Sequence, residues 1–203
     1  GLNGITGFDG GTGTDWLGFF AGGFSGTTGE TYTLNSGNTS NFENIWGSAR
    51  ADTLTGDSNA NIIIGQEGAD TLNGGDGNDT LWGDCTQSAC YSQVDPAVYY
   101  SFNDGTGNDI LNGGAGDDVI YGDAGDDTID GGTGSDTITS GSGSDVIIIT
   151  STSGGDVLTD FSDGIDAIGF DSSLTSSGLT FSASGSDTQI KNGSDLLITL
   201  SGI

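Results

Sequence analysis

The stretch 65–148 repeats a nine-residue pattern. It contains GQEGADTLN from Gly65, GGDGNDTLW from Gly74, GGAGDDVIY from Gly113, GDAGDDTID from Gly122, GGTGSDTIT from Gly131 and SGSGSDVII from Ser140. A seventh copy is split, because Gly83 stands alone and its other eight residues follow from Gly105 as GTGNDILN. The shared pattern is G-G-x-G-x-D-x-U-x, in which U is a large aliphatic residue. A fixed short period of this kind is typical of a solenoid, so the repeat decides the fold.

The nine positions of the repeat divide into a turn and a short strand. Three glycines within four residues permit positive φ angles and close backbone approach, which favours a tight turn. The x-U-x segment that follows favours a three-residue strand, with the aliphatic side chain pointing inward and its neighbours outward. Two nonapeptides then make one full coil, and successive coils stack as parallel strands. The inward column is formed by Leu72, Leu81, Leu111, Ile120, Ile129, Ile138 and Ile147.

This interior is too thin to hold the fold by burial alone. One buried aliphatic side chain contributes roughly 2 kcal/mol, whereas ordering the backbone costs roughly 1 to 2 kcal/mol for every residue of the repeat. The aspartate at position six supplies a hard carboxylate oxygen, and the glycine-rich turn directs backbone carbonyls toward it. Calcium prefers such all-oxygen sites. We therefore expect Ca²⁺ to supply the missing stabilisation.

Composition excludes several classes of function. The chain of 203 residues has 2 Lys plus Arg against 29 Asp plus Glu, for a net charge of −27. Such a chain cannot neutralise phosphates, so nucleic acid and anionic membranes are excluded as partners. There is no His, which removes triads and zinc helices that depend on it, and no enzyme activity is expected. No apolar run is long enough for membrane insertion. The chain lacks an initiator Met, so we expect a processed or excised piece.

The tandem nonapeptide resembles that of the RTX (repeats-in-toxin) proteins of Gram-negative secretion, over residues 47–161. The resemblance implies an all-β fold, a parallel β-roll with two nonapeptides per coil, in which each calcium ion lies between a turn and the turn one full coil later. On one edge the implied ligand pairs are Asp70–Asp109, Asp109–Asp127 and Asp127–Asp145. On the other edge they are Asp79–Asp118, Asp118–Asp136 and Asp136–Asp156.

Two further ligands follow from the same resemblance. Asp52, in a degenerate early repeat, pairs with Asp70 around a weaker ion, whereas the next repeat has Asn61 at the aspartate position. The stretch DVLTDFSDGIDAIGF from Asp156 resembles the closing unit of serralysin-type proteases and related secreted proteins, which adds Asp160. One ion between each pair of stacked turns implies about six to eight Ca²⁺ ions. About seven such ions offset about half of the net charge of −27, which links folding to calcium.

Three regions are expected along the chain. Residues 1–46 form an irregular N-terminal β cap with one isolated repeat, in which Phe42 and Trp46 help to cover the open end of the solenoid. Residues 47–161 form the calcium-binding roll, interrupted by an insertion at 84–104 that protrudes from one edge. Residues 162–203 form a C-terminal cap of antiparallel strands, because short alternating runs there are separated by Gly and Asn turns.

The insertion holds both cysteines and several aromatic residues. Cys85 and Cys90 are expected to form a local disulfide, since C-x4-C without His is a poor zinc site, although two free thiols are the alternative. Tyr99 and Tyr100 are candidates for contact with a partner. A tolerated surface loop and a recognition loop remain equal alternatives.

The outward positions of the repeat also sort by face. Ile64, Trp82 and Tyr121 recur at the same position of alternate repeats, so we expect them to stack as a ladder on one outer face. An exposed ladder would be an apolar contact surface, and the alternative is that another part of the chain covers it.

Two hypotheses for function remain. The first is an extracellular structural protein of a surface layer, filament or matrix that folds on calcium binding, with self-association or a protein on an extracellular surface as partner. The alternative is a C-terminal folding and secretion module of a larger secreted enzyme, toxin or adhesin. Both imply an extracellular location, reached by type I secretion, where calcium is abundant.

Overall fold

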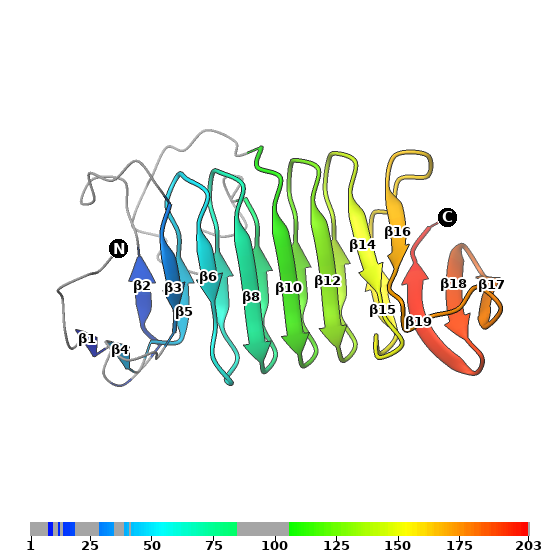
Figure 1. Ribbon diagram of the computed structural model, residues 1–203, viewed down its shortest axis with the longest axis horizontal. Coiled ribbons are helices and arrows are strands. Elements are labelled where there is room, and N and C mark those ends of the chain that lie inside the picture. Colours follow the sequence, from blue (N-terminus) through cyan, green and yellow to red (C-terminus); the bar gives the residue numbers. More distant parts are fainter. Residues whose placement is uncertain are drawn as a thin grey trace.

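Each repeat folds as a turn followed by a short strand, and consecutive strands alternate between two sheets. The computed structural model describes residues 8–9, 12, 14–18, 29–34, 39–40, 42–84 and 106–202. Within these residues the molecule is an elongated stack of coils, with the antiparallel strands β17 (Leu179–Ser184) and β18 (Asp187–Asn192) at the C-terminal end (Figure 1). No helix in the described part is long and apolar enough to cross a membrane.

Two large sheets face each other across the coil interior. The seven-stranded sheet has the order β16 (Ala167–Phe170), β14 (Val146–Ile149), β12 (Thr128–Thr133), β10 (Ile110–Ala115), β8 (Thr71–Asp76), β6 (Thr53–Thr55) and β3 (Thr31–Thr33). The ten-stranded sheet has the order β17 (Leu179–Ser184), β18 (Asp187–Asn192), β19 (Asp195–Leu200), β15 (Asp156–Leu158), β13 (Thr137–Thr139), β11 (Val119–Tyr121), β9 (Thr80–Trp82), β7 (Ile62–Ile64), β5 (Asn44–Trp46) and β2 (Trp16–Gly18). A separate pair joins β1 (Phe8–Asp9) to β4 (Thr39–Ser40).

The strand register follows the two-repeat coil. Leu111 in β10 pairs with Ile129 in β12, which lies one coil, that is two nonapeptides, later in the chain. In β8 and β10, Leu72 pairs with Leu111 although the sequence separation is larger by the length of the insertion. The parallel β-roll is therefore confirmed, and the insertion leaves the ladder intact because it enters and leaves at one turn.

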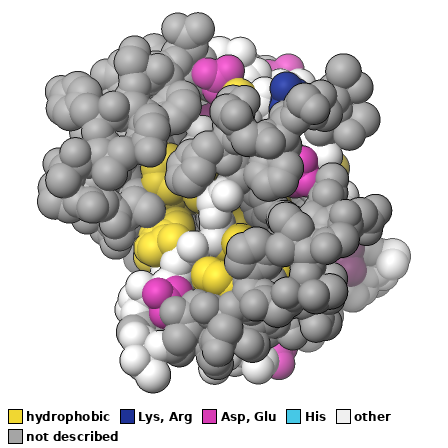
Figure 2. Space-filling view, turned by 90° about the vertical axis from the view of Figure 1, so that its left-hand side faces the viewer, with side chains coloured by type: hydrophobic (Ala, Val, Ile, Leu, Met, Phe, Trp, Pro, Cys, Tyr) yellow, Lys and Arg dark blue, Asp and Glu magenta, His cyan; other side chains and the backbone are white. Residues whose placement is uncertain are grey.

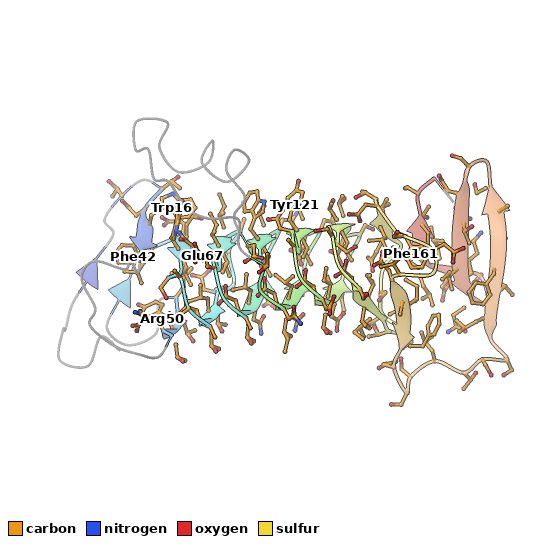
Figure 3. All side chains as sticks on the ribbon, turned by 90° about the horizontal axis from the view of Figure 1, so that it is seen from above. Trp16, Phe42, Arg50, Glu67, Tyr121 and Phe161 are labelled. Atoms are coloured by element: carbon orange, nitrogen blue, oxygen red, sulfur yellow. The ribbon has the colours of Figure 1, made fainter. Side chains whose placement is uncertain are left out.

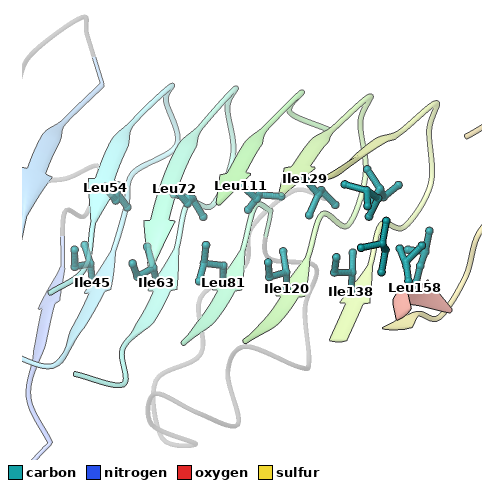
Figure 4. Packing of buried hydrophobic residues seen from close by; sticks show 14 of the residues in the cluster. Ile45, Leu54, Ile63, Leu72, Leu81, Leu111, Ile120, Ile129, Ile138 and Leu158 are labelled. Atoms are coloured by element: carbon teal, nitrogen blue, oxygen red, sulfur yellow. The ribbon is translucent and has the colours of Figure 1, made fainter. Parts of the chain in front are cut away.

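The hydrophobic interior is the predicted aliphatic column. All seven predicted residues are at most 1% exposed, and Ile45, Leu54, Ile63 and Leu158 extend the two rows toward the ends. Figure 4 shows the rows facing each other, one from each sheet. Seen from the N-terminal end, hydrophobic side chains lie near the middle and acidic ones lie around them (Figure 2).

The parallel ladders begin before the predicted boundary at residue 47. Strand β5 pairs in parallel with β7, β2 pairs with β5, and β3 pairs with β6. Phe42 lies in the core cluster, but Trp46 lies in a separate outer cluster and does not cover the end of the core. Strands β3 and β5 lack the glycine pattern of the repeat, so the period could not show that they join the coils, whereas β2 ends the isolated repeat GGTGTDWLG that begins at Gly10.

The C-terminal residues differ from the predicted antiparallel cap in two strands. Strand β16 pairs in parallel with β14, and β19 pairs in parallel with β15. Only the pairs β17–β18 and β18–β19 are antiparallel. The roll continues here because Ile147 still pairs with Ile168 and Leu158 with Leu200, which extends both inward rows by one coil.

Candidate metal-binding columns

The position-six side chains form two columns, one along each edge of the roll. The first column contains Asp52, Asp70, Asp109, Asp127 and Asp145, and the second contains Asn61, Asp79, Asp118, Asp136 and Asp156. None of these residues is more than 2% exposed. They are buried because each ends a turn, glycine-rich except before Asp52 and Asn61, and directly precedes a strand of the core.

One oxygen of each carboxylate is used to stack successive coils. The backbone N–H of each aspartate donates to Oδ1 of the aspartate one coil later. The N···O distances are 2.7 Å for Asp70–Asp109 and Asp79–Asp118, 2.8 Å for Asp109–Asp127, 2.9 Å for Asp118–Asp136, 3.0 Å for Asp127–Asp145 and 3.1 Å for Asp136–Asp156. The structure therefore brings together the six residue pairs that the resemblance implied.

The second oxygen of each carboxylate is buried without a hydrogen-bond partner. This holds for Oδ2 of Asp70, Asp79, Asp109, Asp118, Asp127, Asp136, Asp145 and Asp156. Burying an unpaired carboxylate oxygen is strongly unfavourable, so a repeated set of them requires a partner outside the protein's own donors.

Main-chain carbonyls lie beside these free oxygens. A Cβ placed on Gly113 would meet both Asp118 Oδ2 and the carbonyl oxygen of Gly131, which belongs to the next coil. The same relation joins Gly122 to Asp127 Oδ2 and the carbonyl of Ser140. Glycine at position one thus leaves a space lined by a carboxylate oxygen and a carbonyl oxygen. Hard oxygen ligands of this kind suit Ca²⁺.

The electrostatics of the columns also call for a cation. Burial, and then the negative charge of neighbouring aspartates, raises the pKa of Asp70 to about 8, and the same causes raise the pKa values of Asp79 and Asp127 to about 7. The chain has only 2 Lys plus Arg to balance these charges. In the described residues no three acidic, His or Cys side chains gather at one point. A site here therefore combines carboxylates with main-chain carbonyls, and the residues present fit calcium.

Asn61 provides an internal contrast to the aspartates. Its Oδ1 accepts from the N–H of Asp57 at 2.7 Å, and its Nδ2 donates to the carbonyl of Glu43 at 2.8 Å. Both ends of the amide are satisfied, so this turn closes with its own hydrogen bonds. This turn therefore lacks the free carboxylate oxygen that marks the aspartate turns.

Two predicted ligands differ from the rest. Asp52 accepts backbone N–H groups with both oxygens, from Glu30 and from Ser48. Asp160 likewise accepts from the N–H groups of Ser140 and Gly141, at 2.9 and 2.8 Å. Neither carboxylate keeps a free buried oxygen, so neither offers the feature that marks the eight column aspartates.

Two acidic residues near the columns were missed. The N–H of Asp145 donates to Asp166 Oδ1 at 3.2 Å, so Asp166 continues the first column. Its D-A-I stretch matches the D-x-U signature, but its spacing from Asp145 breaks the period. Asp84, assigned to the insertion, is fully buried, and its Oδ1 has no partner.

The predicted outer ladder is present and longer than expected. Trp46, Ile64, Trp82 and Tyr121 pair in register across β5, β7, β9 and β11. The rings of Trp82 and Tyr121 stack at 5.3 Å between centroids, with 9° between their planes. Trp16 lies on the same side of the roll (Figure 3).

Three of the four ladder residues are nevertheless buried, and Tyr121 is half-buried. Trp46 is 4% exposed, Ile64 is 0% exposed and Trp82 is 6% exposed, which favours the alternative that the chain itself covers the ladder. The remaining candidates, Cys85, Cys90, Tyr99 and Tyr100, lie outside the described residues, so the disulfide and their contacts stay predictions.

A model of a known protein family matches the repeat region. The family model of the RTX calcium-binding nonapeptide repeat matches residues 39–72, 46–81, 103–138 and 122–148. Among solved structures, the extracellular lipase LipA from Serratia marcescens is similar, with a TM-score of 0.32 and 18% identity, over 93% of this chain. The match spans 40% of that lipase chain. No curated protein matches the chain significantly in sequence.

Proposed function

Because the chain carries RTX calcium-binding nonapeptide repeats, we propose that it is a secreted structural protein that calcium folds into a rigid rod outside the cell. The observation that carries this proposal is the set of eight buried Oδ2 atoms without a partner. Beside five of these oxygens, those of Asp70, Asp79, Asp109, Asp118 and Asp127, lies a carbonyl of the next coil, so one cation can join two coils. About six to eight ions in the two columns are proposed, with one between each pair of stacked turns.

Calcium binding supplies the stabilisation that burial of the hydrophobic core does not provide. Without it, buried carboxylates repel one another, and the single inward row on each sheet is too thin to offset the entropy of the chain. With it, each ion supplies a positive charge between Oδ2 and the carbonyls, so binding free energy becomes folding free energy. The chain stays unfolded where calcium is scarce and folds after type I secretion.

Circular dichroism in chelator and in calcium tests this function. We expect a disordered spectrum in chelator and a strand spectrum at roughly millimolar Ca²⁺, the range of extracellular calcium modules. Mg²⁺ serves as the control ion, since it demands shorter, octahedral coordination and should not restore the fold. A strand spectrum that persists in chelator would contradict the proposal.

Self-association of these rods is the finer role that we propose. Among the described residues, β17 ends the ten-stranded sheet and pairs only with β18, so its other edge could pair with another chain. Phe181 on this strand is 63% exposed. A free edge with an exposed aromatic side chain favours assembly in a surface layer, filament or matrix.

The other candidate is a folding module of a larger secreted protein, and light scattering separates the two. A structural protein should form large particles when calcium is added, and Phe181→Ser should reduce this without changing calcium binding. Trp82→Ser tests the buried ladder in the same assay, where loss of assembly with calcium binding intact would indicate an interface. Monomers at high protein concentration in calcium would favour the module.

A further inference from the structure

The two sheets of the roll end at different levels on the C-terminal side. Among the described residues, β16 is the last strand of the seven-stranded sheet and pairs only with β14. The ten-stranded sheet continues past β15 and β19 with the hairpin β17–β18. Figure 1 shows this hairpin beyond β16, at the end of the stack. Strands β16, β17 and β18 therefore form a C-terminal step, in which the hairpin extends past the end of the opposite sheet.

The inward rows of the core continue onto the C-terminal step. Phe181 in β17 pairs with Ile190 in β18, which pairs with the fully buried Ile198 in β19. Because directly paired residues of neighbouring strands lie on one face of a sheet, Phe181 is on the face that holds the core. On the other sheet, Phe170 pairs with the fully buried Ile149. Phe170 therefore lies on an inner face as well.

Both phenylalanines are exposed although they lie on inner faces. Phe181 is 63% exposed and Phe170 is 40% exposed, and Ile165 in the turn before β16 is 55% exposed. Of the large hydrophobic side chains in the described residues, only Ile110 is also exposed. Exposed apolar side chains that gather at one end of a molecule indicate a contact surface.

The segment that joins the two sheets at this end does not cover these rings. Residues 171–178 lead from β16 to β17, and Leu174 in this segment packs against the core cluster. Phe170 and Phe181 keep their exposure in spite of this contact. The inner face of the hairpin therefore still lacks a cover.

The charge of this region favours a second copy of the chain as the cover. The whole chain has a net charge of −27, so two copies repel each other over most of their surfaces. Strands β16 and β17 contain no charged residue, and neither does the stretch 172–186. Lys191, one of the 2 basic residues, lies in the neighbouring strand β18. Repulsion between two copies is therefore reduced where the two edge strands lie.

The shape of the C-terminal step also fits a second copy of itself. A half-turn about an axis parallel to the strands places β17 of each copy beside β16 of the other copy. Both sheet edges then gain a neighbouring strand, which removes two edges with unpaired backbone groups. The inner faces of the two hairpins cover each other, which buries both copies of Phe181. A two-fold contact of this kind closes on itself and joins two molecules only.

We propose that two copies of this chain join end to end through the C-terminal step, with β16 of each copy paired with β17 of the other. The proposal rests on the self-association proposed above and deepens it, because it names the partner and the contact. Both sheets and the hydrophobic interior then continue from one roll into the next. The unit of assembly is a rod of double length with an N-terminal end at each tip.

Mass and length together test this joint. Sedimentation equilibrium of the full chain in calcium gives the mass, and small-angle X-ray scattering gives the longest dimension. Both are measured below the protein concentration at which light scattering detects large particles. We expect a dimer about twice as long as one roll, since an end-to-end pair adds the two lengths.

Two variants address the two sides of the contact. Truncating an aromatic side chain at the centre of an interface weakens one contact by about tenfold or more. Each dimer holds the contact twice, so Phe181→Ser and Phe170→Ser should each weaken dimerisation by about 100-fold. Ile110→Ser is the matched control, because Ile110 is 54% exposed but lies in β10, away from the end of the sheet. The control should dimerise as the unaltered chain does.

Circular dichroism in calcium checks that each variant folds, and if Phe170→Ser does not fold, Phe181→Ser decides the question alone. A monomer in calcium, or a dimer no longer than one roll, refutes the joint and leaves calcium-dependent folding intact. A dimer of double length that neither phenylalanine variant weakens also refutes it. A strand spectrum that does not depend on calcium refutes the proposed function instead, and the mass and length of the folded chain still decide the joint.

Discussion

Replacing Asp118 by Asn separates calcium binding from coil stacking. Oδ1 of Asp118 accepts from the N–H of Asp79 at 2.7 Å, and an amide oxygen can keep that bond. The amide nitrogen then replaces Oδ2, which lies unpartnered beside Gly113 and the carbonyl of Gly131. A hydrogen bond from this nitrogen to the carbonyl closes the turn without a metal, as the satisfied amide of Asn61 shows.

The expected magnitude combines two opposing effects. Asp118 pairs with Asp79 and with Asp136, so the variant removes a charge from two proposed calcium positions. A tenfold loss at each position is about 1.4 kcal/mol, so the pair loses about 3 kcal/mol. The new hydrogen bond returns about 1 kcal/mol. Stability in saturating calcium should therefore fall by about 2 kcal/mol, while structure in chelator should increase.

Urea unfolding in calcium, together with circular dichroism in chelator, measures both effects. Asp117→Asn is the control, because Asp117 lies next to Asp118 but is exposed. The N–H of Ser135 donates to Asp117 Oδ1 at 2.9 Å, and the amide oxygen of Asn can accept the same hydrogen bond. If Asp118→Asn behaves like Asp117→Asn in both measurements, the assignment of Oδ2 to calcium is refuted.

Three further predictions address the core, the turns and pH. Ile129→Ala should lower the free energy of unfolding in calcium by about 2 to 5 kcal/mol, because Ile129 is fully buried between Leu111 and Ile147; an unchanged urea midpoint would contradict this. Gly116→Ala should disrupt folding, because φ is 140° at this residue and a Cβ would overlap the carbonyl of Gly77. Gly185→Ala is the control, because φ is 71° there and a Cβ would meet open space, so that only local strain is expected. Equal melting temperatures for the two variants would refute the overlap. In chelator, the chain should lose strand structure between about pH 4 and pH 8, since the folded pKa of Asp70 is raised from 3.8 to about 8. A carboxyl group whose pKa is higher in the folded state stabilises that state at pH values below its unfolded-state pKa, and this stabilisation is lost as the pH rises through the folded-state pKa. A strand signal in chelator that grows with pH would contradict this pH dependence.

The period of the repeat was sufficient to predict the roll and the members of its two columns. Within the repeats, the D-x-U signature places the inward aliphatic residues and the column aspartates at known positions, because a solenoid converts sequence spacing directly into stacking. Leu111 and Asp109 follow the insertion and still keep this register. The period could not reveal β3 and β5, since their sequences lack the glycine turns, and it did not show that β2, which follows the isolated repeat from Gly10, joins the same sheet.

The amino-acid sequence by itself thus determined the coil, its inward rows and the calcium chemistry of its turns, since all of these arise from contacts repeated at a fixed spacing. Only the tertiary structure decided features that depend on packing between unlike segments. It showed that Trp46, Ile64 and Trp82 of the outer ladder are buried, that β16 continues the parallel sheet, and that the fully buried Asp84 has an oxygen without a partner. These features involve burial and charge contributed by residues outside the motif, which no period records.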